Sequence, residues 1–174
     1  MDFSEIMKQA SKIQDQMKSA KEELKNIETE GTSGGGLVKV TINGDHELKK
    51  IDIANCENLT SITNLTRNCQ ELTYIKARGC YQLNDDSMKD IANNCYELEH
   101  IDVAYCPDIT DAGVVSVVDN CPNLTAINIS GCSKITDRAI IAIAEICPNL
   151  TSISLADCFQ VSDAAVKKLS DQCK

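Results

Sequence analysis

The ten cysteines of this 174-residue chain recur at nearly constant spacing, and that spacing limits the fold more than any other feature. They form two rows, in which neighbouring members are 24 or 26 residues apart. The rows are Cys56, Cys80, Cys106, Cys132 and Cys158, and Cys69, Cys95, Cys121, Cys147 and Cys173. A fixed period of this length is typical of a stacked array in which each unit contacts only its neighbours.

Each period contains a short strand pattern followed by a helix pattern. One unit opens with L-E-H-I-D-V, in which Ile101 and Val103 have period two and lie on one face of a strand. Thr110 then suits a helix amino cap, and the next residue, Asp111, lies favourably in the helix dipole. Pro122 follows the second cysteine and ends the helix. The sequence therefore predicts one strand and one helix per unit.

This motif, L-x-x-I-x-[IVL]-x-x-C-x-x-[IV]-[TS]-D, resembles the cysteine-containing leucine-rich repeats of F-box-type ubiquitin-ligase adaptors. The resemblance spans residues 48–174, is weaker where Asn84-Asp85 replaces Thr-Asp, and is degenerate in residues 48–71. It implies an α/β fold, a five-repeat solenoid with a parallel sheet, outer helices and a concave sheet face of the kind that binds proteins.

Residues 1–53 carry no such repeat and begin with a helix pattern. Asp2 and Glu5 are close to a capping box. Apolar residues then recur with alternating steps of four and three: Ile6, Ala10, Ile13, Met17, Ala20, Leu24 and Ile27. This spacing predicts a long helix with a narrow apolar seam.

A β-hairpin is expected next. Residues 36–43 alternate like a half-buried strand, Asn43-Gly44-Asp45 is a turn signal, and residues 47–53 form the returning strand. Gly34–Gly36 is expected to be a flexible or bulged strand junction. Because Leu48–Ile53 also fits the L-x-x-I-x-I of a first repeat, we expect one strand shared by the hairpin and the parallel sheet.

The front segment resembles the YbaB/EbfC family of bacterial nucleoid-associated proteins. The residues that carry the resemblance are Met7–Ala10, Met17, Glu22–Leu24, Gly31, Ser33–Gly44 and Leu48–Ile53. They correspond to the front half of such a protein, and the resemblance implies a dimeric, DNA-associated protein. Two families joined in register at one strand indicate an engineered fusion, a designed chimeric scaffold with no biological ligand or catalysis.

Two further functions remain open. The first is a protein-interaction module that binds through the concave face, and the second is a DNA-associated dimer retained from the YbaB-like part. The net charge of −9 argues against nucleic acid as a partner, since DNA binding depends on a positive surface. Residues 1–50 hold eight lysines against nine acidic residues, so this segment is not basic either.

The cysteines are expected to be buried, free thiols without metal or other cofactor. The chain has no C-x-x-C pair and two histidines, and every cysteine occupies a repeat-equivalent position. No apolar run approaches the ~18 residues of a membrane helix, and no secretory signal is present. We therefore expect a cytoplasmic protein in a reducing compartment.

The candidate protein-binding residues lie at the strand positions expected to face the concave side. They are Lys50, Asp52, Tyr74, Lys76, Arg78, His100 and Asp102. The alternative is a solvated face whose charges only support neighbouring strands. His100 with Asp102 is the nearest approach to a catalytic pair, and no nucleophile is implied beside it, so we expect no enzyme.

Two expectations concern the ends of the array. Residues 1–53, helix and hairpin together, are expected to cap the first repeat of the 48–174 solenoid and leave the protein a monomer. At the other end, residues 150–155 are expected to form a bare sheet edge, with Val161, Val166 and Leu169 partly covered. Bare edges invite pairing, so any weak self-association is expected there.

Overall fold

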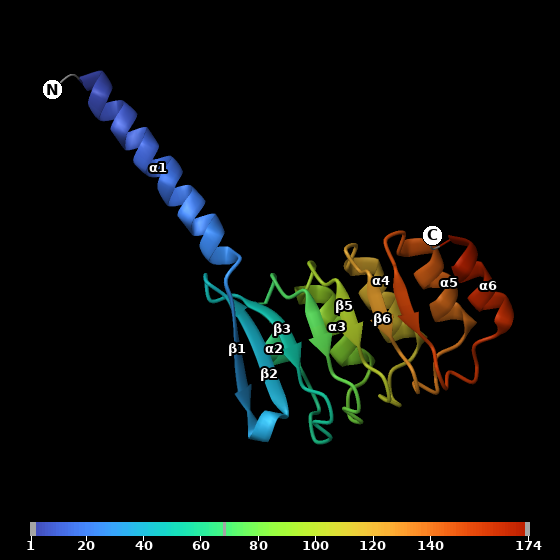
Figure 1. Ribbon diagram of the computed structural model, residues 1–174. Helices are drawn as coiled ribbons and strands as arrows, with labels where there is room; N and C mark the ends of the chain where they lie inside the picture. The colour runs from blue at the N-terminus through green and yellow to red at the C-terminus, as the bar shows by residue number, and fades with distance from the viewer. Residues whose placement is uncertain (1–2, 68, 173–174) are drawn as a thin grey trace.

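The computed structural model describes residues 3–67 and 69–172 and shows an elongated repeat body of two layers, a sheet and a row of helices, with one projecting helix (Figure 1). Every unit of the body contributes a strand to one side and a helix to the other. The front elements are α1 (Phe3–Lys25), β1 (Glu28–Ser33), a 3-10 turn η1 (Gly34–Gly36), β2 (Val38–Asn43) and β3 (Leu48–Asp52). The repeat elements are α2 (Thr63–Thr66), β4 (Tyr74–Lys76), α3 (Asp85–Asn94), β5 (His100–Asp102), α4 (Asp111–Asn120), β6 (Ala126–Asn128), α5 (Asp137–Ile146), β7 (Ser152–Ser154) and α6 (Asp163–Gln172).

The strands form one seven-stranded sheet in chain order, β1 to β7. β1, β2 and β3 pair antiparallel, and β3 to β7 pair parallel. Ile51 in β3 is opposite Val40 of the hairpin on one side and Ile75 of β4 on the other. The predicted α/β solenoid and its shared strand are confirmed.

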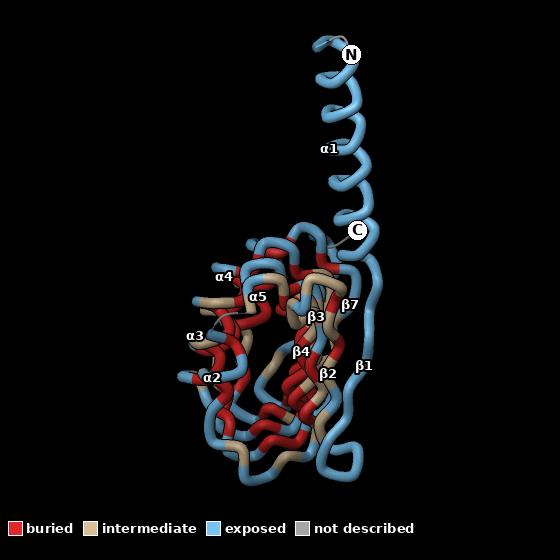
Figure 2. The backbone as a smooth tube through the Cα atoms, turned by 90° about the vertical axis from the view of Figure 1, so that its left-hand side faces the viewer, coloured by how far each residue is buried: buried red, intermediate tan, exposed pale blue. Residues whose placement is uncertain are grey.

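The core lies between the sheet and the helices, where buried residues face each other across the body (Figure 2). Ile51, Ile75, Ile101 and Ile127 stack in register at 1–4% exposure. Four first-row cysteines, Cys80, Cys106, Cys132 and Cys158, are buried at the turn after the strands. Each of these thiols donates to a carbonyl oxygen of the preceding repeat, as Cys132 does to Val103 at 3.3 Å. Cysteine fits here because it is small, apolar and still able to donate a weak hydrogen bond.

The Thr-Asp step links neighbouring helices as well as capping them. The Thr110 hydroxyl oxygen accepts from the Ala112 N–H at 3.2 Å, as expected of an amino cap. The carboxylate of Asp85, one repeat earlier, accepts from the Thr110 N–H at 2.8 Å and from its hydroxyl at 2.7 Å. Asp111 makes the same pair of bonds to Thr136. Each Asp therefore fastens one helix start to the next.

The first repeat is degenerate in structure as in sequence. Its helix α2 has four residues, whereas α3 to α6 have ten each. The cap position of α2 is Ile62, which offers no side-chain hydrogen bond. Without the Thr-Asp step, the helix lacks the side-chain cap of the later helices, and its link to the next repeat is a hydrogen bond from the Thr63 hydroxyl to Asp90 of α3.

Helix α1 projects away from the body and contains no buried residue (Figures 1 and 2). Its seam is open to solvent, with Ile13 56% and Met17 68% exposed. The prediction that the helix covers the first repeat is therefore wrong, and the hairpin alone continues the sheet there. The expected role of Asp2 in the helix start lies outside the described residues.

The attachment of α1 depends on Gly44 in the hairpin turn. The Gly44 N–H donates to the Leu24 carbonyl oxygen at 3.1 Å. A Cβ at this position would lie 2.3 Å from that oxygen, so the close approach requires glycine. Lys25 adds ion pairs to Asp45 and Glu47, each at 3.8 Å.

Strand β1 and its turn were not expected from the sequence. Gly34, Gly35 and Gly36 have positive φ angles of 60°, 68° and 92° and turn the chain from β1 into β2. The predicted flexible junction is thus a tight turn. Every residue of β1 is exposed, and the strand forms the outer edge of the sheet.

Candidate protein-binding surface

The sheet face opposite the helices, here called the concave face, gathers the residues predicted to bind a partner. Strand register places Lys50 beside Tyr74 and Tyr74 beside His100. A second row runs through Asp52, Lys76 and Asp102. Arg78 follows the end of β4 by two residues. The structure therefore brings all seven predicted residues together over β3, β4 and β5.

Tyr74 and His100 form a stacked aromatic pair at the centre of this face. Their ring centroids are 4.4 Å apart and the ring planes differ by 6°. Burial lowers the pKa of His100, an effect partly opposed by the charge of Asp102. The imidazole is therefore neutral at neutral pH and presents a flat, weakly polar surface beside the tyrosine.

Most charged groups of the concave face are paired within the fold. Lys76 donates to Asp52 at 3.0 Å, and this hydrogen bond raises the pKa of Lys76. Lys50 pairs with Glu28 on β1 at 2.6 Å. Asp102, 8% exposed, accepts from the Ala104 N–H at 3.0 Å and so holds the end of its strand. These groups fit the alternative of charges that support neighbouring strands.

Arg78 differs from its neighbours because its partner is an aromatic ring. Its guanidinium carbon lies 4.8 Å from the ring centroid of Tyr105, a distance suited to a cation–π contact. Tyr105 follows β5 by three residues and is 38% exposed. Strand alternation does not predict a role for this tyrosine, because the residue lies in the turn beyond the strand.

A signal for Tyr105 does exist in the sequence. One turn position per repeat has a left-handed backbone: Asn55, Gly79, Tyr105, Gly131 and Asp157, with φ of 62°, 71°, 59°, 71° and 60°. Asn, Asp and Gly tolerate this region, whereas a bulky residue there is an outlier. Aligned repeats would have shown tyrosine as the exception in this row.

The Tyr105 ring lies along the turns toward the last repeat. A Cβ on Gly131 would be 2.5 Å from Cδ1 of the ring, so the ring occupies the space that glycine leaves free. The Tyr105 hydroxyl donates a long hydrogen bond of 3.4 Å to Asp157. We call Arg78, Tyr105 and Asp157 the Tyr105 cluster. It adds an aromatic and a cationic group to one edge of the concave face.

A small hollow extends the concave face toward the hairpin. It has a volume of 160 Å³ and lies over β1 to β4. Its lining is Glu30, Lys39, Thr41, Lys50, Ile51, Asp52 and Tyr74. The mixture of both charges with one aromatic ring suits contact with a polar protein surface better than the binding of an apolar small molecule.

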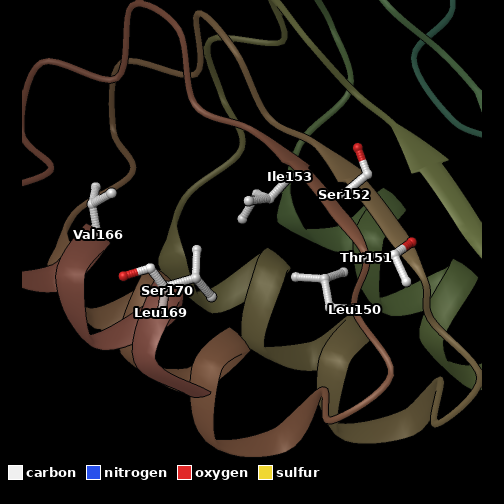
Figure 3. A pocket seen from close by; sticks show the side chains of 7 residues that line it. All are labelled: Leu150, Thr151, Ser152, Ile153, Val166, Leu169 and Ser170. Atoms are coloured by element: carbon white, nitrogen blue, oxygen red, sulfur yellow. The ribbon is translucent and has the colours of Figure 1, made fainter. Parts of the chain in front are cut away.

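A more apolar groove of 330 Å³ lies at the last repeat, between β7 and α6. Figure 3 shows Leu150, Ile153 and Leu169 directed into it, with Val166 on the helix side. Leu169 is buried at 5% exposure, whereas Val161 is half-buried and Val166 is 43% exposed, so the expected partial covering holds for Val161 and Val166 and not for Leu169. β7 is shorter than the expected strand and lies at the sheet edge. Self-association through this repeat stays a prediction.

The cysteines provide packing rather than a reactive site. Burial raises the pKa of Cys95, Cys106 and Cys121 to about 12, which keeps these thiols protonated and poorly nucleophilic. Within residues 3–67 and 69–172, no group of three or more metal-ligating side chains is arranged to hold an ion. Cys173, the last member of its row, lies outside the described residues. In the same ranges, no helix combines the length and apolar character needed to cross a membrane.

Known proteins resemble the two parts of the chain separately. The YbaB/EbfC DNA-binding family matches residues 1–63, and the leucine-rich repeat family matches residues 97–118 and 120–144. A nucleoid-associated protein of Hahella chejuensis is 54% identical over 51 residues, which is 29% of this chain and 47% of that protein. One from Francisella philomiragia is 50% identical over 52 residues, 30% of this chain and 47% of that protein. The chain thus spans about half the length of these relatives.

The repeat body has a counterpart among solved structures. A chain in the crystal structure of the Rad7 and Elc1 complex in yeast matches with a TM-score of 0.60 at 22% identity. The match covers 64% of this chain and 29% of that one. At this identity the likeness shows the fold alone, a repeat solenoid.

These matches correct one interpretation of the sequence. The interpretation of the chain as an engineered scaffold without a biological ligand is wrong, because its first segment is similar along a continuous stretch to natural nucleoid-associated proteins. The two-part character itself is confirmed: a YbaB/EbfC-like front at residues 1–63 is followed by leucine-rich repeats that match within residues 97–144.

Proposed function

We propose that this chain is a non-enzymatic, cytoplasmic binding protein whose leucine-rich array binds another protein through the concave face. The observation that carries the proposal is the continuous face over β3, β4 and β5, where Tyr74, His100 and Arg78 lie together. Tyrosine and arginine are enriched among the residues that dominate binding energies. Buried, reduced thiols and nucleoid-associated relatives support the cytoplasmic assignment.

The pairing of charges supports a protein partner over a small ligand. Since Lys76 and Asp52 already bind each other, a partner gains little by approaching either alone. A partner protein with a broad polar surface that complements the alternating charges would instead be held in a defined register and orientation. The stacked rings of Tyr74 and His100 would then supply the central area that loses water.

Site-specific photocrosslinking tests the proposal. Benzoylphenylalanine replaces His100 on the concave face, or Asp119 on the outer helix α4 as the matched control. After irradiation in cell extract, we expect one discrete protein adduct from position 100 and none of that mass from position 119. The adduct should disappear when Lys76→Glu and Tyr74→Ala are added. Equal adducts from both positions would contradict binding through the concave face.

A second candidate is association with DNA through residues 1–63. The observation that favours it is the match to a DNA-binding family over these residues. Helix α1 carries five lysines in an exposed position, Lys8, Lys12, Lys18, Lys21 and Lys25, against four acidic residues. The near balance of charge makes any such binding weak and dependent on salt.

Fluorescence anisotropy with a labelled duplex DNA tests this second function. Binding at low salt should weaken steeply between about 50 and 200 mM salt if phosphate contacts carry it. Lys12→Glu with Lys18→Glu should abolish it, whereas Lys167→Glu with Lys168→Glu on α6 should not. If both double variants bind like the unchanged protein, α1 does not contact DNA.

A further inference from the structure

Tyr105 holds a backbone conformation that disfavours its own side chain. Its φ of 59° lies in the left-handed region, where the equivalent positions carry Asn55, Gly79, Gly131 and Asp157. Those residue types accept the region, and tyrosine does so only when the surrounding structure holds it. Strained residues of this kind gather at ligand-contacting positions. The ring is held by its fit over Gly131 and remains 38% exposed.

Arg78 has no carboxylate partner among the described residues. On neighbouring strands Lys49 binds Glu71 at 3.1 Å, and Lys50 and Lys76 have carboxylate partners of their own. None of the ion pairs formed between described residues includes Arg78, which lies over the Tyr105 ring instead. Stacking on a ring leaves the edge N–H donors of a guanidinium open to a planar anion.

We infer that Arg78 and Tyr105 together anchor a protein partner that presents an Asp or Glu carboxylate next to a large apolar side chain. The carboxylate would accept two N–H bonds from Arg78, and the apolar side chain would cover the exposed part of the Tyr105 ring. This inference rests on the proposed function and names the chemistry its partner must have.

Charge around the cluster favours one carboxylate over a polyanion. Asp157 lies at the far end of the Tyr105 ring, and the whole chain carries a net charge of −9. A phosphate-rich ligand would meet this negative field with several charges, whereas a single carboxylate neutralised by Arg78 meets it with one. The partner surface is therefore a protein segment and not a nucleic acid.

Selection from a phage-displayed library of random dodecapeptides on the full-length protein tests the inference. The enriched peptides should contain an acidic residue beside a large apolar one. Their affinity should fall at least about tenfold on Arg78→Ala and on Tyr105→Asn, which remove the anchor. Arg138→Ala and Tyr96→Asn, which change exposed residues of the same types elsewhere, should bind like the unchanged protein.

Two further measurements separate an anchor from a structural residue. Changing the acidic residue of the peptide to its amide should weaken binding to the unchanged protein and have little effect on Arg78→Ala, as a direct contact requires. Tyr105→Asn should unfold at the same urea concentration as the unchanged protein or a higher one, because asparagine fits the left-handed backbone, as Asn55 does.

The outcomes distinguish this inference from the proposed function. Peptides that lose binding on Tyr74→Ala and keep it on Arg78→Ala and Tyr105→Asn would overturn the anchor and leave the concave face as the binding surface. A clear loss of stability in Tyr105→Asn would overturn the anchor by showing that the ring serves the fold. Failure to enrich any peptide, or binding that no concave variant alters, would count against both.

Discussion

Helix α1 and helix α4 show how different the front segment and the repeat array of this chain are. α1 has 23 residues and none is buried, whereas α4 has ten residues, of which Gly113, Val114, Val117 and Val118 are buried. Helix α4 packs against α3 on one side and α5 on the other and contributes to the common core, while α1 meets the body at its last turn. An apolar seam therefore stabilises a helix only where the fold supplies something to cover it.

The difference predicts that alkaline pH acts on the array far more than on the front segment. Burial raises the pKa of Cys106 and Cys121 to about 12. A cysteine in an unfolded chain has a pKa of about 8.5, so the folded state holds protons that the unfolded state releases. The resulting stability is complete below the unfolded pKa and is lost as the pH rises toward the folded pKa.

Several thiols share this difference, so the free energy of unfolding of the array should fall as the pH rises above about 8.5. Circular dichroism and urea titrations between about pH 8 and pH 11 would measure this effect. Cys106→Ala with Cys132→Ala should flatten the pH dependence. A free energy of unfolding that stays constant over this range would show that these thiols are not protected by the core.

Truncation of a core side chain should destabilise the array far more than the matched change destabilises the front segment. Leu124 is 1% exposed at the centre of the array, so Leu124→Ala should lower the free energy of unfolding by about 2–5 kcal/mol. Ile13→Ala, the matched change on the α1 seam, should lower it by less than about 0.5 kcal/mol. Leu155→Ala, at a half-buried position of the last repeat, should fall between them. Equal losses for Leu124 and Ile13 would mean that α1 is covered in solution.

The sequence predicted the array well because its signals are repeated and local. The L-x-x-I-x-I pattern identified the inward face of the repeat strands β3 to β7, and it also showed that residues 48–53 fit two neighbours. The front segment was harder to predict. The seam of α1 shows which face is apolar and says nothing about what covers it, and the polar sequence of β1 shows no alternation.

The candidate surface could be predicted only in part for a similar physical reason. Strand alternation places Tyr74, Lys76 and His100 on one face because side chains alternate along any strand. Tyr105 lies in a turn, where the direction of the side chain depends on the φ angle. The alternation of side chains along a strand gives no information about that angle. The contact between Arg78 and Tyr105 joins different repeats and appears only once the turns are stacked.

The hydrogen bonds that link neighbouring repeat helices should contribute a smaller but measurable part of the free energy of unfolding. Thr136 caps α5 and donates to Asp111 at 2.6 Å, so Thr136→Val removes a cap and leaves a carboxylate with one donor fewer. We expect a loss of about 1–2 kcal/mol in urea unfolding. Thr151→Val, which removes one bond to a backbone carbonyl at an exposed position, should cost less. A loss of similar size in both would mean that the Asp111 link adds nothing to the cap.

Substitutions in helix α1 should have the smallest effect on stability. Hydrogen exchange of backbone amides compares α1 directly with the array. Because no packing stabilises α1, it opens at little cost, and its amides from Ile6 to Lys21 should exchange orders of magnitude faster than those of Val114 to Val118 in α4. Ile13→Asp with Met17→Asp should leave the urea midpoint of the array unchanged, as expected for side chains that contact solvent. The measurement should be repeated over a hundredfold range of protein concentration. Protection of α1 that rises with concentration and disappears in the double variant would show that a second chain covers the seam. The helix would then be an interface instead of a free arm.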